Sequence, residues 1–261
     1  MSPQRREQRL VFGEVAELYD RYRPGYPDAV FDRIMRFGEL DPGVPGLEVG
    51  CGTGRATVPL AARGLRLTAL EPSPEMARVA IQNTKGMVGV RIVEASFEDW
   101  LLPREPFRVV TSAQAWHWIQ PEVRFIKAHE ALDVRGCLAL FWNIATQIEP
   151  SDGLQGAIED AYRREAPGLV ARVPGESAID RGLEIEDSGL FIDITREVYP
   201  WATTYPADHY LGLVQTQSDY RLLEPAIRTR LLQSLAAVLA DHGNQVPQGY
   251  CTYLYLARRR D

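Results

Sequence analysis

Short apolar runs alternate with amphipathic segments between about residues 28 and 143. The runs have the length and β-rich composition of buried strands, and they cover residues 47–49, 65–70, 90–93, 108–111 and 137–142. The segments between them include helical patterns at residues 27–37, 74–82 and 121–132, and each opens with a proline. Strands and helices that alternate at this spacing form parallel β-α-β units with right-handed crossovers. The pattern therefore predicts a doubly wound, Rossmann-like α/β sheet.

The pattern changes after residue 143. Residues 148–186 are helical or irregular and are interrupted by proline and glycine, so we expect a helical insertion after the fifth strand that caps a pocket. Residues 191–199 and 250–257 read as strands. An amphipathic helix is predicted between them, because apolar residues recur every four positions at Leu223, Ile227, Leu231, Leu235 and Leu239. We expect a single domain over residues 1–261, with an N-terminal lid at 10–26, a cofactor-binding core at 46–143 and C-terminal elements at 191–258.

Composition narrows the class of protein. The 261 residues are 45% hydrophobic and 25% charged, as in ordinary globular proteins. A chain of this size can bury a hydrophobic core without the support of disulfides or metal ions. No apolar run is long enough for a membrane span, and no apolar stretch that would make a secretory signal follows the first arginines. The net charge of -6 argues against nucleic acid as the main partner. Three widely spaced cysteines have neither metal nor redox spacing, so we expect a cytoplasmic protein with no metal site.

The strongest local signal is the segment Leu-Glu-Val-Gly-Cys-Gly-Thr-Gly at residues 47–54. Its three glycines follow the first strand, where they allow a tight turn and the close approach of a ligand; an ordinary glycine-rich turn is the alternative. Glu71 ends the next strand, 21 residues after Gly50, where a carboxylate can accept both hydroxyl protons of a ribose. Glu71 could instead be a helix N-terminal carboxylate ahead of Pro74. Together, the turn and Glu71 favour a nucleoside cofactor.

The order of the glycines separates two classes of cofactor. Dinucleotide-binding folds prefer G-x-G-x-x-G, whereas this chain has G-x-G-x-G followed by Arg55. This spacing resembles motif I of the class I S-adenosylmethionine (SAM) dependent methyltransferases. Residues 12–27, 111–118 and 138–143 also resemble a small-molecule branch of that superfamily, the methyltransferase type 11/25-like proteins. The resemblance implies a seven-stranded sheet with an antiparallel edge, and methyl transfer to oxygen, nitrogen or carbon of a small-molecule acceptor that releases S-adenosylhomocysteine (SAH).

The resemblance also implies cofactor contacts. The glycine turn would border the methionyl part of SAM, Glu71 would hold the ribose, Ser96 and Phe97 would flank the adenine, and Gln114 would lie beside the sulfonium. Phe97 could equally be a core residue. The residues expected to bind the cofactor are Tyr19, Arg23, Glu48, Gly50, Cys51, Gly52, Gly54, Glu71, Pro72, Ser96, Phe97 and Gln114.

Residues for the acceptor come from the fourth and fifth strand ends and from the lid. His117 is flanked by Trp116 and Trp118, and it could accept a proton from the acceptor as a general base. Alternatively, the tryptophans wall the pocket and His117 is a structural residue. Tyr22 and Asn143 are further candidates for acceptor binding. Cys51 has no evident base beside it, so we do not expect it to act as a nucleophile.

The sequence is also compatible with other functions. A protein of this fold could use SAM for cyclisation or other non-methyl chemistry, or bind SAM without turnover. A nicotinamide-dependent oxidoreductase is disfavoured by Arg55 in place of the final glycine. Tyrosine and tryptophan residues in the C-terminal part hint weakly at a homodimer.

Overall fold

The computed structural model describes residues 15–146, 153–170 and 181–261. A sheet of seven strands forms its centre, in the order β3-β2-β1-β4-β5-β7-β6. The strands β1 to β5 are mutually parallel, whereas β7 runs antiparallel to both β5 and β6. This order confirms the predicted doubly wound sheet with an antiparallel edge. The strands are β1 (Pro45–Val49), β2 (Arg66–Glu71), β3 (Val90–Glu94), β4 (Phe107–Ala113), β5 (Leu132–Thr146), β6 (Phe191–Pro206) and β7 (Gln245–Arg259).

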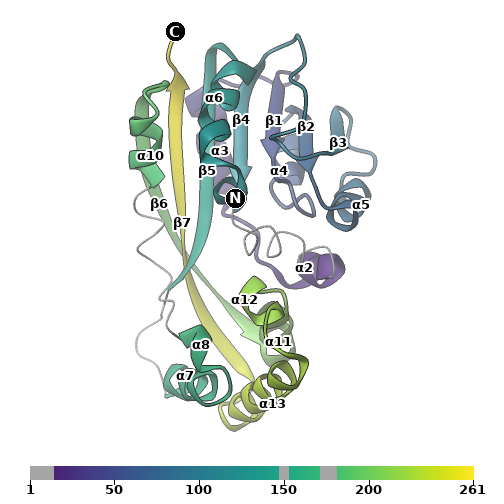
Figure 1. Cartoon of the computed structure of the whole chain (residues 1–261), viewed down its shortest axis with the longest axis vertical. Helices are drawn as coiled ribbons and strands as arrows, with labels where there is room; N and C mark the ends of the chain where they lie inside the picture. The colour runs from purple at the N-terminus through teal and green to yellow at the C-terminus, as the bar shows by residue number, and fades with distance from the viewer. Residues whose placement is uncertain (1–14, 147–152, 171–180) are drawn as a thin grey trace.

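Helices cover both faces of the sheet (Figure 1). One face carries α3 (Asp28–Gly38), α4 (Thr57–Ala62) and α5 (Pro74–Asn83), and the other carries α6 (Pro121–Ala131) and α10 (Arg181–Asp187). The start of α5 follows from its sequence, because Ser73 accepts the Met76 N–H in a side-chain cap and Pro74 occupies the first turn. Alternate strand residues divide the core, so that Val109 packs on the α3 side and Val110 on the α6 side.

The last three strands are longer than the sequence pattern predicted, and β5 extends well beyond the expected range of 137–142. β6 and β7 pair from Phe191 opposite Arg259 to Pro206 opposite Gln245, well beyond the expected ranges of 191–199 and 250–257. The extra length carries the strands past the sheet to a second group of helices, visible in the lower half of Figure 1. These helices are α7 (Leu154–Glu165), α8 (Pro167–Val170), α11 (Ala207–Gln215), α12 (Ser218–Arg221) and α13 (Pro225–Asp241). They bury the far strand ends, and the predicted apolar stripe of α13 is inaccessible at Leu231, Leu235 and Leu239.

Two predicted segments that would roof the site are described in part. Residues 10–14 of the lid lie outside the described residues, and the rest includes α2 (Ala16–Tyr22). Residues 148–152 and 171–180 of the insertion also lie outside them. Within the described parts, α7 and α8 pack among the lower helices, while α10 places Ile185 in the core of the sheet. Two cavities lie at the carboxyl ends of the strands, and no described side chain of the insertion lines either of them. Residues of α2 and of the junction between α11 and α12 line them instead.

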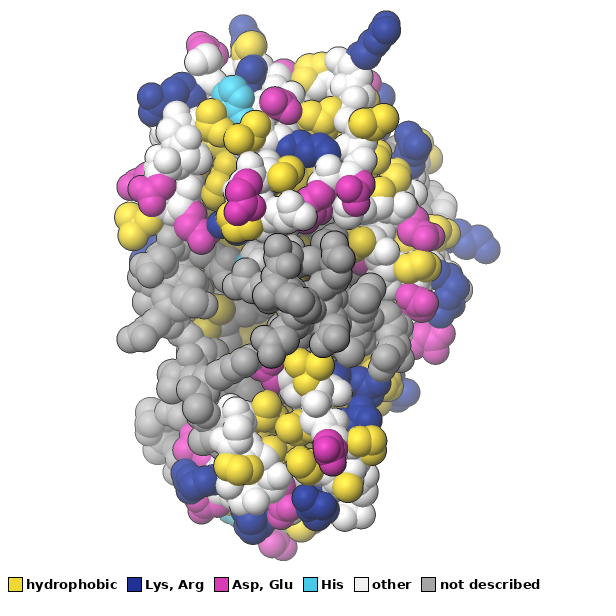
Figure 2. Space-filling model, in the orientation of Figure 1, with side chains coloured by type: hydrophobic (Ala, Val, Ile, Leu, Met, Phe, Trp, Pro, Cys, Tyr) yellow, Lys and Arg dark blue, Asp and Glu magenta, His cyan; other side chains and the backbone are white. Residues whose placement is uncertain are grey.

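The described surface mixes both signs of charge. On the face shown in Figure 2, acidic and basic side chains are interspersed over the coloured residues. Within the described parts of the chain, no helix is long and apolar enough to cross a membrane. Groups of three or more metal-ligating side chains are also absent from the described residues. The expectations on nucleic acid and on metals remain predictions.

Candidate active site

The glycine turn after β1 takes a conformation that side chains would resist. Gly50, Gly52 and Gly54 have φ of 71°, 58° and 90°. A Cβ on Gly50 would lie 2.4 Å from the Cβ of Ala115, so only glycine fits there without a shift of the backbone. At Gly52, by contrast, no heavy atom lies within 4 Å of the Cβ position, and the backbone faces open space. The turn is therefore closed on one side and accessible to a ligand on the other.

Glu71 holds this turn from the end of β2. Its Oε2 accepts the Gly52 N–H and its Oε1 accepts the Ser73 N–H, both at 2.9 Å. Only 8% of the residue is exposed, yet it lines the cavity beside the turn. Each carboxylate oxygen carries two lone pairs, so an oxygen that accepts a backbone N–H can also accept a hydroxyl proton. Glu71 thus orders the turn and keeps acceptor capacity toward the cavity.

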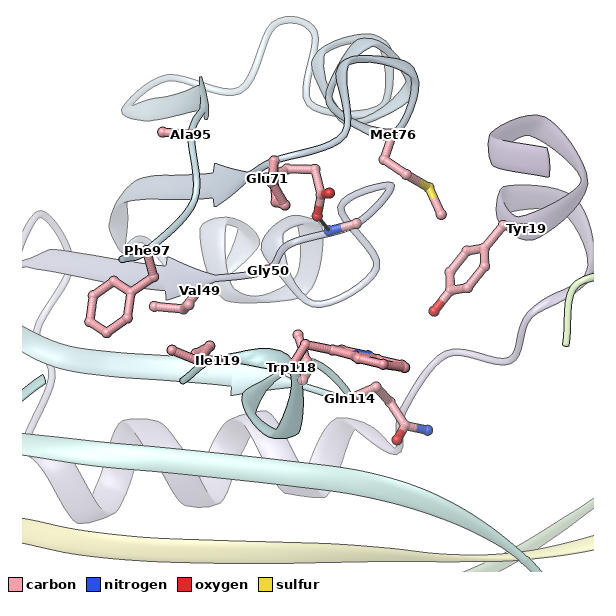
Figure 3. A pocket seen from close by; sticks show the side chains of 14 residues that line it. Tyr19, Val49, Gly50, Glu71, Met76, Ala95, Phe97, Gln114, Trp118 and Ile119 are labelled. Atoms are coloured by element: carbon pink, nitrogen blue, oxygen red, sulfur yellow. Dashed lines mark hydrogen bonds between the residues drawn. The ribbon is translucent and has the colours of Figure 1, made fainter. Parts of the chain in front are cut away.

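The first cavity lies between the turn, the ends of β1 and β4, and α2. In Figure 3, Phe97, Val49 and Ile119 form its apolar end, while Tyr19 and Gln114 lie at the other end. Trp118 presents its indole between these ends, opposite Glu71 and Met76. Gln114 has a left-handed backbone (φ 59°), and its Nε2 donates to the Asn143 carbonyl at 3.0 Å. The cavity is therefore apolar at one end and polar at the other, as a nucleoside with a charged tail requires.

A second cavity continues from the first past the glycine turn, with a volume of about 300 Å³. The two cavities share Gly50, Gly52 and Ala113, together with Tyr19, Gln114 and Trp118. The second one adds side chains from distant elements, namely Arg23, Glu48, Arg55, His117, Gln217 and Tyr250. A ligand in each cavity would meet the other ligand at the shared wall.

The lid is tied down by specific hydrogen bonds. Arg23 donates from Nε to Thr216 Oγ1 at 2.8 Å and from Nη2 to the Thr216 carbonyl at 2.9 Å. The same guanidinium lies 5.2 Å from the centre of the Tyr19 ring, a cation–π contact. The ring of Tyr22 packs edge-on against His209 and over Gly212, where a Cβ would collide with it at 2.5 Å. These contacts join α2 to α11, and each helix lines at least one of the two cavities, through Tyr19 and Leu213.

Asn143 fixes the segment that follows the lid. Its Nδ2 donates to the Gly25 carbonyl at 2.8 Å, and its Oδ1 accepts from Thr252 Oγ1 at 2.6 Å. The residue is 9% exposed but lines the second cavity. Both polar ends of the amide are thus engaged by the protein itself.

His117 is held by two aromatic neighbours. The Trp142 Nε1–H donates to His117 Nδ1 at 3.3 Å, and the Trp118 ring lies 4.8 Å from the imidazole centre. Because an indole nitrogen only donates, Nδ1 of His117 must be the accepting nitrogen. In the neutral ring the proton then resides on Nε2.

Burial controls two ionisable groups around the turn. Burial raises the pKa of the Glu48 carboxyl to about 7, against the effect of Thr57, whose hydroxyl donates to Oε2 at 2.6 Å. Glu48 Oε1 is buried without a hydrogen-bond partner. Burial, together with Glu48 and Glu71, also raises the pKa of the Cys51 thiol well above its ordinary value. Cys51 is thus a protonated, poorly nucleophilic side chain, which agrees with the sequence reasoning.

Four predicted site residues lie away from the two cavity linings. Ser96 caps the turn after β3, where its hydroxyl accepts the Asp99 N–H at 3.1 Å. Trp116 is 1% exposed and packs on Phe97 in the core, because the short helix Trp116–Trp118 turns its two tryptophans in different directions. Tyr22 faces α11, as described above. Gly54 packs on α5, with its Cβ position 3.7 Å from the Cα of Ala80. All other predicted residues line one or both cavities.

Several lining residues were missed by the sequence reasoning. Met76 and Ile119 line the first cavity, and Arg55, Gln217 and Tyr250 line the second. Arg55 directly follows the glycine motif, so its position was a usable signal. Gln217 and Tyr250 carried none, because they reach the site only through the packing of α11 and β7.

Comparison with known proteins shows the family of this chain. A family model described as a methyltransferase domain (Methyltransf_25) matches residues 47–136. An uncharacterised methyltransferase of Geobacillus kaustophilus is 33% identical over 163 residues, covering 59% of this chain and 74% of the relative. One of Mycobacterium tuberculosis is 28% identical over 246 residues, covering 93% of this chain and 90% of the relative.

Solved structures show the same fold. A protein described as a type II methyltransferase from Anaeromyxobacter dehalogenans has a TM-score of 0.62 and 22% identity, covering 91% of this chain and 98% of that one. Phosphoethanolamine N-methyltransferase 2 of Haemonchus contortus, solved with phosphomonomethylethanolamine and SAH, has a TM-score of 0.56 and 15% identity, covering 95% of this chain and 58% of that one. The fold is that of a methyltransferase, and the residues that the family model matches include the glycine turn. The chain belongs to the class I SAM-dependent methyltransferase family, and it is an enzyme of that class.

Proposed function

We propose that this methyltransferase binds SAM in the first cavity and methylates a small-molecule acceptor held in the second. The observation that carries this proposal is the wall shared by the two cavities, formed by Gly50, Gln114 and Trp118 among others. A donor and an acceptor that both touch this wall have their reacting ends together. The volume of about 300 Å³ suits a small molecule.

The residues of the first cavity fit SAM chemically. Glu71 retains lone pairs for the ribose hydroxyls, and Phe97 and Ile119 offer apolar surface for the adenine. The open backbone at Gly52 leaves room for the methionyl chain. Trp118 lies at the shared wall, where the face of an indole attracts a sulfonium cation.

Catalysis by this chain would consist mainly of positioning. When bound, SAM supplies a methyl group activated by the sulfonium, and SAH remains after transfer. The shared wall would align the acceptor atom with the methyl carbon and the sulfur, and such alignment is worth up to roughly 7–11 kcal/mol. The docked lid, tied by Arg23 to Thr216, would exclude water.

His117 fits the role of hydrogen-bond donor better than that of general base. Trp142 occupies Nδ1, so Nε2 of the neutral ring carries a proton. That N–H would orient an acceptor oxygen or nitrogen at the shared wall, and an acceptor that arrives deprotonated needs no base. A base role would first require loss of the Trp142 hydrogen bond.

Calorimetric titration with SAM, SAH and NAD tests the cofactor assignment. We expect SAM and SAH to bind and NAD not to bind. Glu71→Gln should weaken SAM binding by about 10- to 100-fold, because it removes charge-assisted hydrogen bonds worth about 1.5–3 kcal/mol. The exposed Glu75→Gln is the matched control. Binding of NAD in place of SAM would overturn the assignment.

Product mass separates methyl transfer from the alternatives. A methylated acceptor together with SAH supports the proposal, whereas methylthioadenosine would indicate cyclisation chemistry. SAM binding without any turnover would favour a SAM-binding protein. We keep the cytoplasm as the expected location, where SAM is available.

A further inference from the structure

Arg55 lines the second cavity and has no partner among the residues that the structure describes. It makes no hydrogen bond or ion pair with any residue that the structure describes, and its Nε is buried and unpartnered. Arg108 and Arg124 also have a buried, unpartnered Nε, but Arg108 reaches Asp133 at 3.7 Å and Arg124 reaches Glu184 at 3.1 Å. Arg259 reaches no carboxylate among the described residues either, but it lines neither cavity. An unpaired guanidinium in a half-buried site is unfavourable unless a ligand completes it.

Phenol groups line the same cavity as this cation. Tyr26 and Tyr250 line the same cavity, and the Tyr250 hydroxyl is hydrogen-bonded to that of Tyr205 at 3.2 Å. Burial raises the pKa of both Tyr26 and Tyr205, although the charge of Arg55 opposes this rise at each of them. The phenols therefore remain protonated and can donate hydrogen bonds, and donors grouped around a guanidinium form a site for an anion.

Among the described residues, no carboxylate forms an ion pair with Arg55. Glu48 lines the same cavity but forms no ion pair with Arg55. Burial raises the pKa of Glu48 to about 7, so that much of this carboxyl is uncharged near neutral pH. The cavity thus presents a net positive end at Arg55.

We propose that the acceptor carries an anionic group, a carboxylate or a phosphate, which Arg55 binds with hydrogen bonds from Tyr26 and Tyr250. This inference rests on the function proposed above and specifies its substrate class. Arg55 lines the second cavity and not the first, which places the anion beyond the shared wall, away from the reacting end. The anion is therefore a handle, distinct from the atom that is methylated. A guanidinium that binds both oxygens occupies lone pairs that a nucleophile would need.

Binding of small anions to the complex of the protein with SAH tests the anion site, and this test does not require the natural acceptor to be known. The anionic probes are glutarate and malate for carboxylates and glycerophosphate for phosphates. Their neutral counterparts are glutaramide, malamide and glycerol. Calorimetry with the SAH-saturated protein should detect binding of at least one anion and of no neutral counterpart. The bound anion tells the carboxylate source from the phosphate source.

Arg55→Met should raise the dissociation constant of that anion by about 10- to 100-fold. Arg55→Lys keeps the charge but loses the bidentate geometry, and it should give a smaller increase. The half-exposed Arg66→Met on β2 is the control for loss of a positive charge. Melting temperatures establish that each variant is folded.

The outcomes separate this inference from the proposed function. If SAM and SAH bind to wild type but no anion binds to the SAH complex, the handle is refuted and the methyltransferase assignment stands. If Arg55→Met weakens SAM binding as much as anion binding, Arg55 holds the cofactor and the inference is again refuted. If neither SAM nor SAH binds to the folded wild type, the proposed function itself fails.

Discussion

Replacement of Glu48 by glutamine should change how the stability of this enzyme depends on pH. Glu48 is 1% exposed, its Oε1 lacks a partner, and burial raises its pKa from 4.5 to about 7. The folded state therefore holds this proton more tightly than the unfolded state does. Unfolding releases the proton between these two values, so stability falls as pH rises from about 4.5 to about 7 and then levels off.

The size of the effect follows from the shift. A displacement from 4.5 to about 7 corresponds to about 3 kcal/mol, of which about 2.5 kcal/mol develops between pH 5 and pH 8. Glutamine does not titrate, so Glu48→Gln removes this dependence. Its amide NH₂ would occupy the unpartnered position, a pH-independent penalty of about 1–3 kcal/mol. The pH dependence of the difference between variant and wild type is therefore the quantity to measure.

Urea denaturation of both proteins at pH 5 and pH 8 provides this measurement. The free energy of unfolding of Glu48→Gln, relative to wild type, should rise by about 2.5 kcal/mol between the two pH values. The exposed Glu75→Gln controls for loss of one carboxylate. A difference between variant and wild type that is the same at both pH values would refute the argument, because Glu48 would then have no raised pKa.

Three further predictions concern the site. His117→Gln should keep at least about a tenth of wild-type turnover with an unchanged pH–rate profile, since glutamine can also donate a hydrogen bond. Loss of one limb of the pH–rate profile in this variant would indicate that His117 acts as a general base. Cys51→Ser should retain turnover within about tenfold, and the wild-type thiol should resist alkylation at pH 8, because burial raises its pKa; rapid alkylation would contradict this. Gly50→Ala should lower the free energy of unfolding, measured by urea titration, by about 1–3 kcal/mol more than Gly52→Ala does. Both substitutions place a Cβ at a positive φ, but only the Cβ at residue 50 would also collide with Ala115. Gly52→Ala should instead weaken SAM binding, and equal stabilities of the two variants would argue against the collision.

Local patterns in the sequence were sufficient for the parallel half of the sheet. Alternating strand and helix signals predicted β1 to β5 and the helices between them. A helix or strand that buries one face repeats its apolar residues at a fixed spacing, and this spacing can be read from residues close together in the sequence. The strands β5, β6 and β7 were predicted too short. Their extra residues become strand because they pair with each other and are covered by α11 and α13, which no local pattern encodes.

The same distinction applies to neighbouring side chains in the site. Trp116 and Trp118 are equivalent as sequence signals, but a short helical turn sends Trp116 into the core and Trp118 to the shared wall. Ser96 was a reasonable choice for an adenine contact, yet the structure uses its hydroxyl as a cap and turns Ala95 and Phe97 toward the cavity.

The sequence by itself determined the alternating architecture, the glycine turn and the carboxylate at the end of β2. Each of these depends on residues close together in the chain, where backbone conformation and periodic burial act directly. Only the tertiary structure decided what surrounds the second cavity. Leu213, Ser218 and Tyr250 reach it from two helices and a strand more than 150 residues beyond the turn. Arg55 has no partner among the described residues, and this depends on all its neighbours together. Whether a charge is paired depends on which distant groups the packing brings within hydrogen-bonding distance, and this is a property of the whole fold.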